Sequence, residues 1–309
     1  MVSRRKFLVL AGVGATGAVL AQPLKALYAR EALGLSLRGI GYGHLKKDPR
    51  GLLDLPVGFQ YRAFSRKGDK MSDGHPVPGD HDGMAAFAGP KGSTILIRNH
   101  ELSPDEDPRV VAPAAKQYDP TCRGGTTTLI VGPDRQLIRD YVSLAGTYRN
   151  CAGGATPWNS WISCEENTST PQTNQAGDVT NVSKRHGYNF EVPVLAAGPV
   201  APEPLVAMGR FNHEAIAVDP RTGIVYQTED RGDSLFYRFV PKQPGNLKAG
   251  GLLEALKIKN RPQANTRTNF PIGKPMAVEW IPIEDVDPAK DTVRVEGFAK
   301  GATQFSRGE

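Results

Sequence analysis

The 309-residue sequence predicts an all-β fold, and three observations support that prediction. Short runs of apolar and β-branched residues recur along the chain, separated by clusters of Asp, Gly and Pro. Glycine and proline are abundant, at 34 and 25 residues, as expected when many strands are joined by tight turns. Only one segment has a helical pattern. An antiparallel sandwich, barrel or propeller is therefore expected.

The N-terminal segment has the features of an export signal. Arg4 and Arg5 precede an apolar, glycine- and alanine-rich run that is too short to span a bilayer comfortably. The motif SRRKFL matches a twin-arginine signal, with an ordinary secretion signal or a membrane anchor as the alternatives. We predict a signal peptide at residues 1–26 and one domain at 27–309. The twin-arginine translocase is then a partner during export. The mature protein is expected in the periplasm or secreted, without a stable membrane span.

The remaining segments predict strands in the following order. STILIR at 93–98 is a strand that leads into Asn99, His100 and Glu101. A hairpin follows, with strands at 126–131 and 136–144 around a Gly-Pro-Asp turn. Three strands fill 213–241, with turns at 219–223 and 231–233. Residues 251–259 are the one predicted helix, although its apolar face is short.

A recurring arrangement favours a propeller among the all-β folds. Three-strand units each begin just after a polar cluster, at Asn99-His100-Glu101, at Cys151 and at Asn212-His213-Glu214. In a propeller, the innermost strand of each blade faces a central channel, so polar residues at equivalent positions converge there. The glycine-rich and proline-rich segment SDGHPVPGDHDGM at 72–84 is expected to be a loop.

The charge and the cysteine count narrow the function classes. The net charge of +6 is diffuse, and no basic helix or aromatic-basic array points to nucleic acid. Three cysteines in an exported chain leave at least one thiol unpaired. A free thiol outside the cytoplasm is open to oxidation unless it is buried or bound, which favours a metal ligand. Cys151 is the candidate, whereas Cys164 is expected to pack in a sheet.

Four clusters are rich in side chains of the metal-binding type. They are Cys151 with Glu165, Glu166 and Asn167; Asn212-His213-Glu214; Glu229-Asp230; and Arg307 with Glu309. Carboxylate and amide oxygens suit hard cations such as Ca²⁺, whereas a thiolate suits a softer or trivalent transition metal. Massed carboxylates also need cations to compensate their charge. The alternative is that each carboxylate is a surface group or a turn cap.

Three stretches of this sequence resemble the PhoX-type alkaline phosphatases. They are GTYRNCAGGATPWNSWISCEEN, GRFNHEAIAVDPRTGIVYQTEDRGDSLFYRF and the terminal FSRGE, and the export signal is similar too. The resemblance implies a six-bladed β-propeller with iron (Fe³⁺) and calcium (Ca²⁺) in its channel. It also implies hydrolysis of phosphate monoesters. Because the sequence stops at its RxE motif, we expect the propeller to be incomplete at its C-terminal end.

The same resemblance assigns roles to seven residues. Cys151, Glu166 and Glu309 are implied iron ligands, Glu214 a metal bridge, and Asn167 and Asp230 calcium ligands, while Arg307 is implied to hold the phosphate. Two other functions remain open from the residues themselves. A calcium-dependent propeller hydrolase such as a lactonase would not need the cysteine. A non-catalytic envelope propeller that binds protein partners would need no metal. We expect a monomer.

Overall fold

The computed structural model describes residues 42–175 and 182–308. The predicted signal peptide and Glu309 therefore lie outside the described residues. The described residues fall into two compact units that divide between Phe64 and Ser65. In the first unit, strands β1 (Leu45–Lys46) and β2 (Leu55–Pro56) form a short antiparallel ladder. The carboxylate of Asp48 accepts backbone hydrogen bonds from Arg50, Leu52 and Leu53, which closes the loop between these strands.

The second unit contains three antiparallel sheets whose strands follow one another in chain order. The first sheet comprises β3 (His81–Ala88), β4 (Thr94–His100), β5 (Gly124–Val131) and β6 (Leu137–Thr147). The second comprises β7 (Asn150–Ala155), β8 (Ser160–Glu165) and β9 (Asn189–Pro193). The third comprises β10 (His213–Val218), β11 (Val225–Glu229), β12 (Tyr237–Pro241), β13 (Gly251–Ile258) and β14 (Val278–Pro282). One α-helix, α3 (Val293–Ala299), packs on the third sheet.

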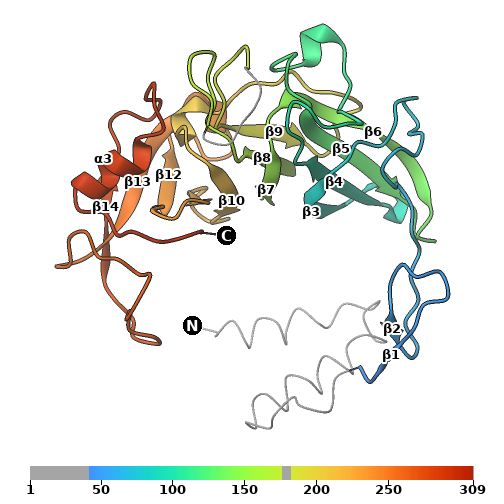
Figure 1. Ribbon diagram of the computed structural model, residues 1–309, viewed down its shortest axis with the longest axis horizontal. Coiled ribbons are helices and arrows are strands. Elements are labelled where there is room, and N and C mark those ends of the chain that lie inside the picture. Colours follow the sequence, from blue (N-terminus) through green and yellow to red (C-terminus); the bar gives the residue numbers. More distant parts are fainter. Residues whose placement is uncertain (1–41, 176–181, 309) are drawn as a thin grey trace. The chain divides into compact units, whose positions relative to one another are not determined.

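Within this unit the three sheets lie side by side in an arc, and β3, β7 and β10 lie along its inner edge (Figure 1). The cores lie between neighbouring sheets. Ile97, Leu144, Trp161 and Phe190 fill the first interface. Strand β8 serves both interfaces because successive side chains point to opposite faces: Trp161 packs toward the first sheet, and Ile162 toward the third.

Most of the strand predictions are confirmed. The hairpin over 124–147 and the three strands over 213–241 are present, with a turn closed by the Gly223 N–H to the Asp219 carbonyl. The fold is mostly β, with several antiparallel sheets, as predicted. Among the described residues no helix is long and apolar enough to cross a membrane.

Three local predictions were wrong. The segment 251–259 is strand β13 rather than a helix, because it pairs with β12 on one side and β14 on the other. Such tertiary pairing overrides helix propensity. The predicted loop at 72–84 is confirmed for residues 72–80, but residues from His81 onward form strand β3. Asn99 and His100 end β4, and the next strand, β5, begins only at Gly124, so no strand unit begins just after this cluster as predicted.

The inner strands approach one another so closely that glycine is required between them. A Cβ on Gly83 of β3 would lie 2.7 Å from Ala152 Cα of β7. A Cβ on Gly154 of β7 would collide with the carbonyl oxygen and side chain of Ile216 on β10. Ala152 Cα and the Ile216 carbonyl oxygen are backbone atoms, which cannot move aside as the end of a flexible side chain can.

We expect Gly154→Ala to destabilise the protein by about 1–3 kcal/mol, the usual cost of overpacking a close contact. Gly198→Ala is the matched control, since a Cβ there meets nothing within 4 Å. That variant should stay within about 0.5 kcal/mol of the parent, as ordinary surface substitutions do. Chemical denaturation of the two variants measures the difference, and equal midpoints would contradict the packing argument.

Candidate functional site

The three inner strands each carry an irregularity at the same place. The register of β3 with β4 shifts between His81 and Met84, that of β7 with β8 between Asn150 and Gly153, and that of β10 with β11 between His213 and Ile216. Bulges of this kind re-aim side chains and are common beside active sites. The second residue of each strand falls in the shifted part: Asp82, Cys151 and Glu214.

Three of the sequence-predicted ligands meet at this point. One ligand atom from each of Cys151, Glu166 and Glu214 lies within 4.8 Å of the other two. The Cys151 Sγ lies 3.5 Å from Glu214 Oε2 and 3.3 Å from the carbonyl oxygen of His213. All three cysteines are free and buried, so Cys151 is in no disulfide. A sulfur beside two carboxylates is a donor set for a transition metal.

The electrostatics of the site show that negative charges are crowded there. Burial is the main cause that raises the pKa of Glu166 to about 8. The charge of Arg149 opposes this rise, and the charges of Glu101, Glu214 and Asp230 contribute to it. Burial and the charge of Glu214 raise the pKa of the Cys151 thiol well above its usual value. Without a cation, the thiol therefore keeps its proton. Metal binding must displace that proton, which couples metal affinity to pH.

Asp230 also belongs to this charge cluster, since its charge acts on Glu166. Its Oδ1 lies 2.6 Å from Arg307 Nε in an ion pair. The contact is not aligned as a hydrogen bond, and this buried oxygen accepts none. A buried carboxylate oxygen without a hydrogen bond is a suitable place for a cation. The Arg307 side chain is 69% exposed, so its other guanidinium nitrogens remain accessible to a ligand.

The C-terminal segment brings Arg307 to this position. The Arg307 N–H donates to the carbonyl oxygen of Arg231, and the Gly308 N–H to that of Glu229. In Figure 1 the segment up to Gly308 runs inward toward the third sheet. Glu309, the other predicted residue of this motif, lies outside the described residues.

One predicted calcium ligand, Asn167, and two neighbours of predicted ligands, Glu165 and Glu229, make hydrogen bonds that hold the fold. Asn167 is buried, and its side-chain oxygen accepts the Ser169 N–H at 2.8 Å in a turn of its own backbone. Glu165 points away from Glu166 into the core, where it accepts hydrogen bonds from His186 and from the backbone of Tyr148 and Gly187. Glu229 is also buried and accepts bonds from the Leu235 N–H and the Tyr237 hydroxyl.

The two Asn-His-Glu motifs place their side chains in the same way. His100 and His213 are fully buried, while Glu101 and Glu214 lie partly exposed at the cluster. Asn99 donates to the carbonyl oxygens of Cys151 and Ala152 at 3.0 and 2.7 Å. Its own oxygen accepts from the side chains of Trp161 and Ser163. These hydrogen bonds from Asn99 hold the backbone of β7 in place at Cys151.

Sequence reasoning missed Arg149 entirely and assigned no role to Asp82 or Glu101. Arg149 donates to Glu101 at 3.0 Å and to Glu166 at 3.2 Å, so it balances part of the negative charge. Burial and a hydrogen bond with Glu101 raise the pKa of Asp82 to about 6. Arg149 stands two residues before Cys151, and Glu101 closes the first Asn-His-Glu motif. Proximity in sequence was the available signal for both.

The comparisons with known proteins agree with the motifs. A family model described as alkaline phosphatase PhoX matches residues 40–137 and 117–309. The chain belongs to the PhoX family. A search of curated proteins finds no match.

One solved structure similar to this chain is that of Pseudomonas fluorescens PhoX in complex with vanadate, a transition state analogue. The two share 18% identity with a TM-score of 0.49, and the match covers 74% of this chain and 55% of that chain. The chain thus spans little more than half the length of this solved PhoX-family protein.

The buried histidines predict a loss of stability in acid. Burial and the neighbouring Arg98 and His81 hold the pKa of His100 well below its ordinary value of 6.5. The unfolded chain therefore takes up a proton at this residue as pH falls below about 6.5, while the folded chain resists it. The stability that neutral His100 contributes at pH 7 is lost progressively below that pH.

We expect His100→Gln to flatten the decline in unfolding free energy between about pH 6.5 and pH 4, even if the variant is less stable at pH 7. His44→Gln, at an exposed histidine, is the control and should keep the parent's slope. Urea unfolding at a series of pH values measures the slopes. Parallel curves for the parent and His100→Gln would show that His100 does not carry the acid sensitivity.

Proposed function

We propose that this protein is a metal-dependent alkaline phosphatase that hydrolyses phosphate monoesters outside the cytoplasm, with iron and calcium as its metals. The observation that carries the proposal is the convergence of Cys151, Glu166 and Glu214 at the inner edge of adjacent sheets, in a chain of the PhoX family. The export signal supports the location and the twin-arginine translocase as partner. These two points, and a monomeric product, remain predictions.

We also propose that the three sheets are blades of a six-bladed propeller. Each is an antiparallel meander in chain order with its first strand at the inner edge, which is how propeller blades are built. Asp82, Cys151 and Glu214 then occupy equivalent positions of consecutive blades. Convergence of equivalent positions supplies several ligands at one point from residues far apart in the sequence.

The residues present fit the implied metals. Cys151, Glu166 and Glu214 offer a soft donor and carboxylates for iron, and the carboxylate of Asp230, whose Oδ1 also pairs with Arg307, suits calcium. Asn167 and Glu309 remain predicted ligands. When bound, the metals would act as Lewis acids that neutralise charge on the phosphate oxygens. The chain's own part is to hold these ligands rigid and to balance the excess negative charge through Arg149.

Arg307 is the residue that we assign to the substrate. Its guanidinium is fixed at one nitrogen by Asp230 and is otherwise exposed at the rim of the carboxylate cluster. A planar fork of donors matches two oxygens of a phosphate group better than an ammonium does. The ion pair with Asp230 therefore orients the fork toward a substrate whose oxygens also face the metals.

Cys151→Ala should abolish iron binding and with it most of the turnover of p-nitrophenyl phosphate at alkaline pH. The thiolate is the soft donor of the set, and the carboxylates that remain favour calcium. Metal analysis and rates are measured on the protein in its full natural length, purified after native export. Cys164→Ala is the matched control because Cys164 packs among apolar residues. A parent that holds calcium alone and opens lactones while sparing phosphate esters would replace this proposal with the lactonase.

Arg307→Lys should keep the metals but lower kcat/KM by roughly 10- to 100-fold, because one charge-assisted hydrogen bond worth about 1.5–3 kcal/mol is lost. Steady-state kinetics with the same ester, beside metal analysis, separate the two effects. Arg221→Lys, at an exposed arginine of a turn, is the control. Unchanged kcat/KM in Arg307→Lys would remove Arg307 from the substrate site.

A further inference from the structure

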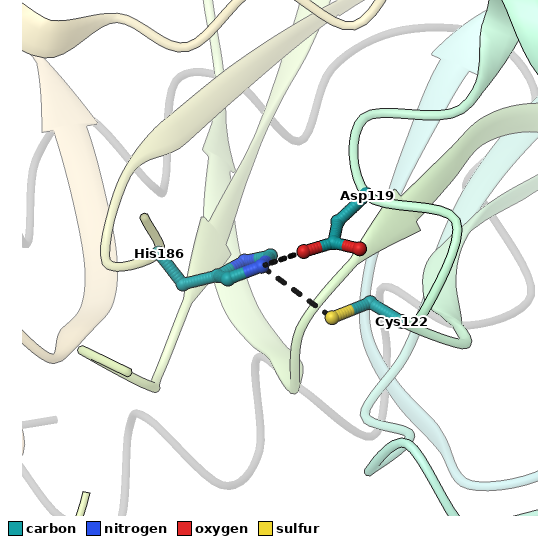
Figure 2. A group of neighbouring side chains, drawn as sticks. All are labelled: Asp119, Cys122 and His186. Carbon is teal, nitrogen blue, oxygen red and sulfur yellow. Dashed lines mark hydrogen bonds and ion pairs between the residues drawn. The ribbon is translucent and has the colours of Figure 1, made fainter. Parts of the chain in front are cut away.

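A second group of metal-binding side chains contacts Glu165, the neighbour in sequence of Glu166. Asp119, Cys122 and His186 are all buried, and one ligand atom of each lies within 4.8 Å of the other two. Asp119 and Cys122 belong to one tight turn, closed by the Cys122 N–H to the Asp119 carbonyl oxygen. His186 comes from the segment before β9, and Figure 2 shows its ring facing both partners.

The geometry around the His186 ring is uneven. On one side Nδ1 lies 2.7 Å from Glu165 Oε1, the length of a charge-assisted hydrogen bond. On the other side Nε2 lies 3.3 Å from Asp119 Oδ2 and 3.4 Å from Cys122 Sγ. The first of these distances is long for a bond between a charged histidine and a carboxylate, which is typically about 2.7–2.9 Å.

The two longer distances match those between two ligands of one small cation. In a tetrahedral zinc site, ordinary Zn–N, Zn–O and Zn–S bond lengths place the nitrogen about 3.3 Å from the oxygen and about 3.5 Å from the sulfur. The hydrogen bond from Nδ1 to Glu165 is also the usual support of a zinc-bound histidine, because it fixes the tautomer that leaves Nε2 for the metal.

We propose that Asp119, Cys122 and His186 form a buried zinc site, separate from the proposed iron and calcium centre, in which Glu165 orients His186. Zinc is the divalent ion that suits a mixed sulfur, nitrogen and oxygen set, and the two distances from His186 Nε2 agree with a tetrahedral zinc site. Three protein ligands leave the fourth position to a water molecule. The inference does not rest on the proposed phosphatase activity.

The proton balance of this step leaves the buried charge unchanged. Without metal, the histidine is held as an imidazolium between two carboxylates, and Cys122 is a thiol whose pKa burial raises. Zn²⁺ replaces two protons, one from Nε2 and one from Sγ, which pass to the solvent. Two positive charges leave and two arrive, so the site adds no net charge to the interior. Because zinc binding releases protons, the affinity for zinc must rise with pH.

Asp119 is held for this role by the surrounding backbone. Its carboxylate accepts hydrogen bonds from the Thr121, Ser183 and Lys184 N–H groups at 2.7–2.8 Å. These donors keep the carboxylate charged and fix its direction. A zinc ion would therefore join the turn at 119–122 to the segment at 183–186, and through Glu165 to β8.

The test uses zinc chloride as the probe in a Cys151→Ala background, which removes the thiolate of the other centre. After chelation and reloading, Cys151→Ala should hold one more zinc per chain than Cys151→Ala/Cys122→Ser. Its zinc should raise the Tm, and it should release two protons per zinc bound. Cys151→Ala/Cys164→Ala is the matched control and should keep the zinc.

X-ray absorption at the zinc edge of Cys151→Ala decides the point even if the Cys122 variant does not fold. One sulfur in the zinc shell, retained in the Cys164 double variant, supports the proposal. Equal zinc in the variants with and without Cys122, or a zinc shell without sulfur, overturns it. So does a chain that binds no zinc and keeps His186 as an imidazolium between its two carboxylates.

Discussion

The lateral contact of β7 with β3 and β10 is the constraint on which the rest of the site depends. Gly83 and Gly154 leave room for the backbones to approach closer than side chains would allow. In the same region the ladders of β3, β7 and β10 shift their register, and the second residue of each of these strands lies in the shifted part. Such bulges re-aim side chains. Cys151 and Glu214 therefore reach 3.5 Å from each other although 63 residues separate them.

Because adjacent side chains point to opposite sides, one of two neighbouring glutamates stabilises the fold and the other belongs to the candidate metal site. Glu165 and Glu166 are adjacent, yet Glu165 ties His186 and the start of β9 to β8, while Glu166 faces Arg149 and Cys151. Each buried carboxylate is paired with a different cation. The burial of each charge is therefore compensated by its own partner, so the loss of one ion pair need not disrupt the other.

The sequence predicted those elements whose local signals agree with their tertiary setting. The hairpin over 124–147 has turn residues between two β-rich runs, and both signals give the same answer. The segment 251–258 has leucines that fit either period, and only its pairing with β12 and β14 decides for a strand. Motifs brought Cys151, Glu166 and Glu214 together. Arg149 could have been noticed from its place two residues before Cys151, whereas the Asp119–Cys122–His186 group depends on contacts that no spacing reveals.

Equivalent strand positions with different residues give the site its mixed chemistry. Asp82, Cys151 and Glu214 each stand second in an inner strand, so one backbone geometry presents a carboxylate, a thiol and a second carboxylate. His81, Asn150 and His213 precede them. Burial holds the pKa of His213 at about 3 and lowers that of His81, so neither adds a positive charge at neutral pH. The negative charge at the inner edge is thus balanced chiefly by Arg149 and Arg307, which leaves an excess that metal cations are suited to neutralise.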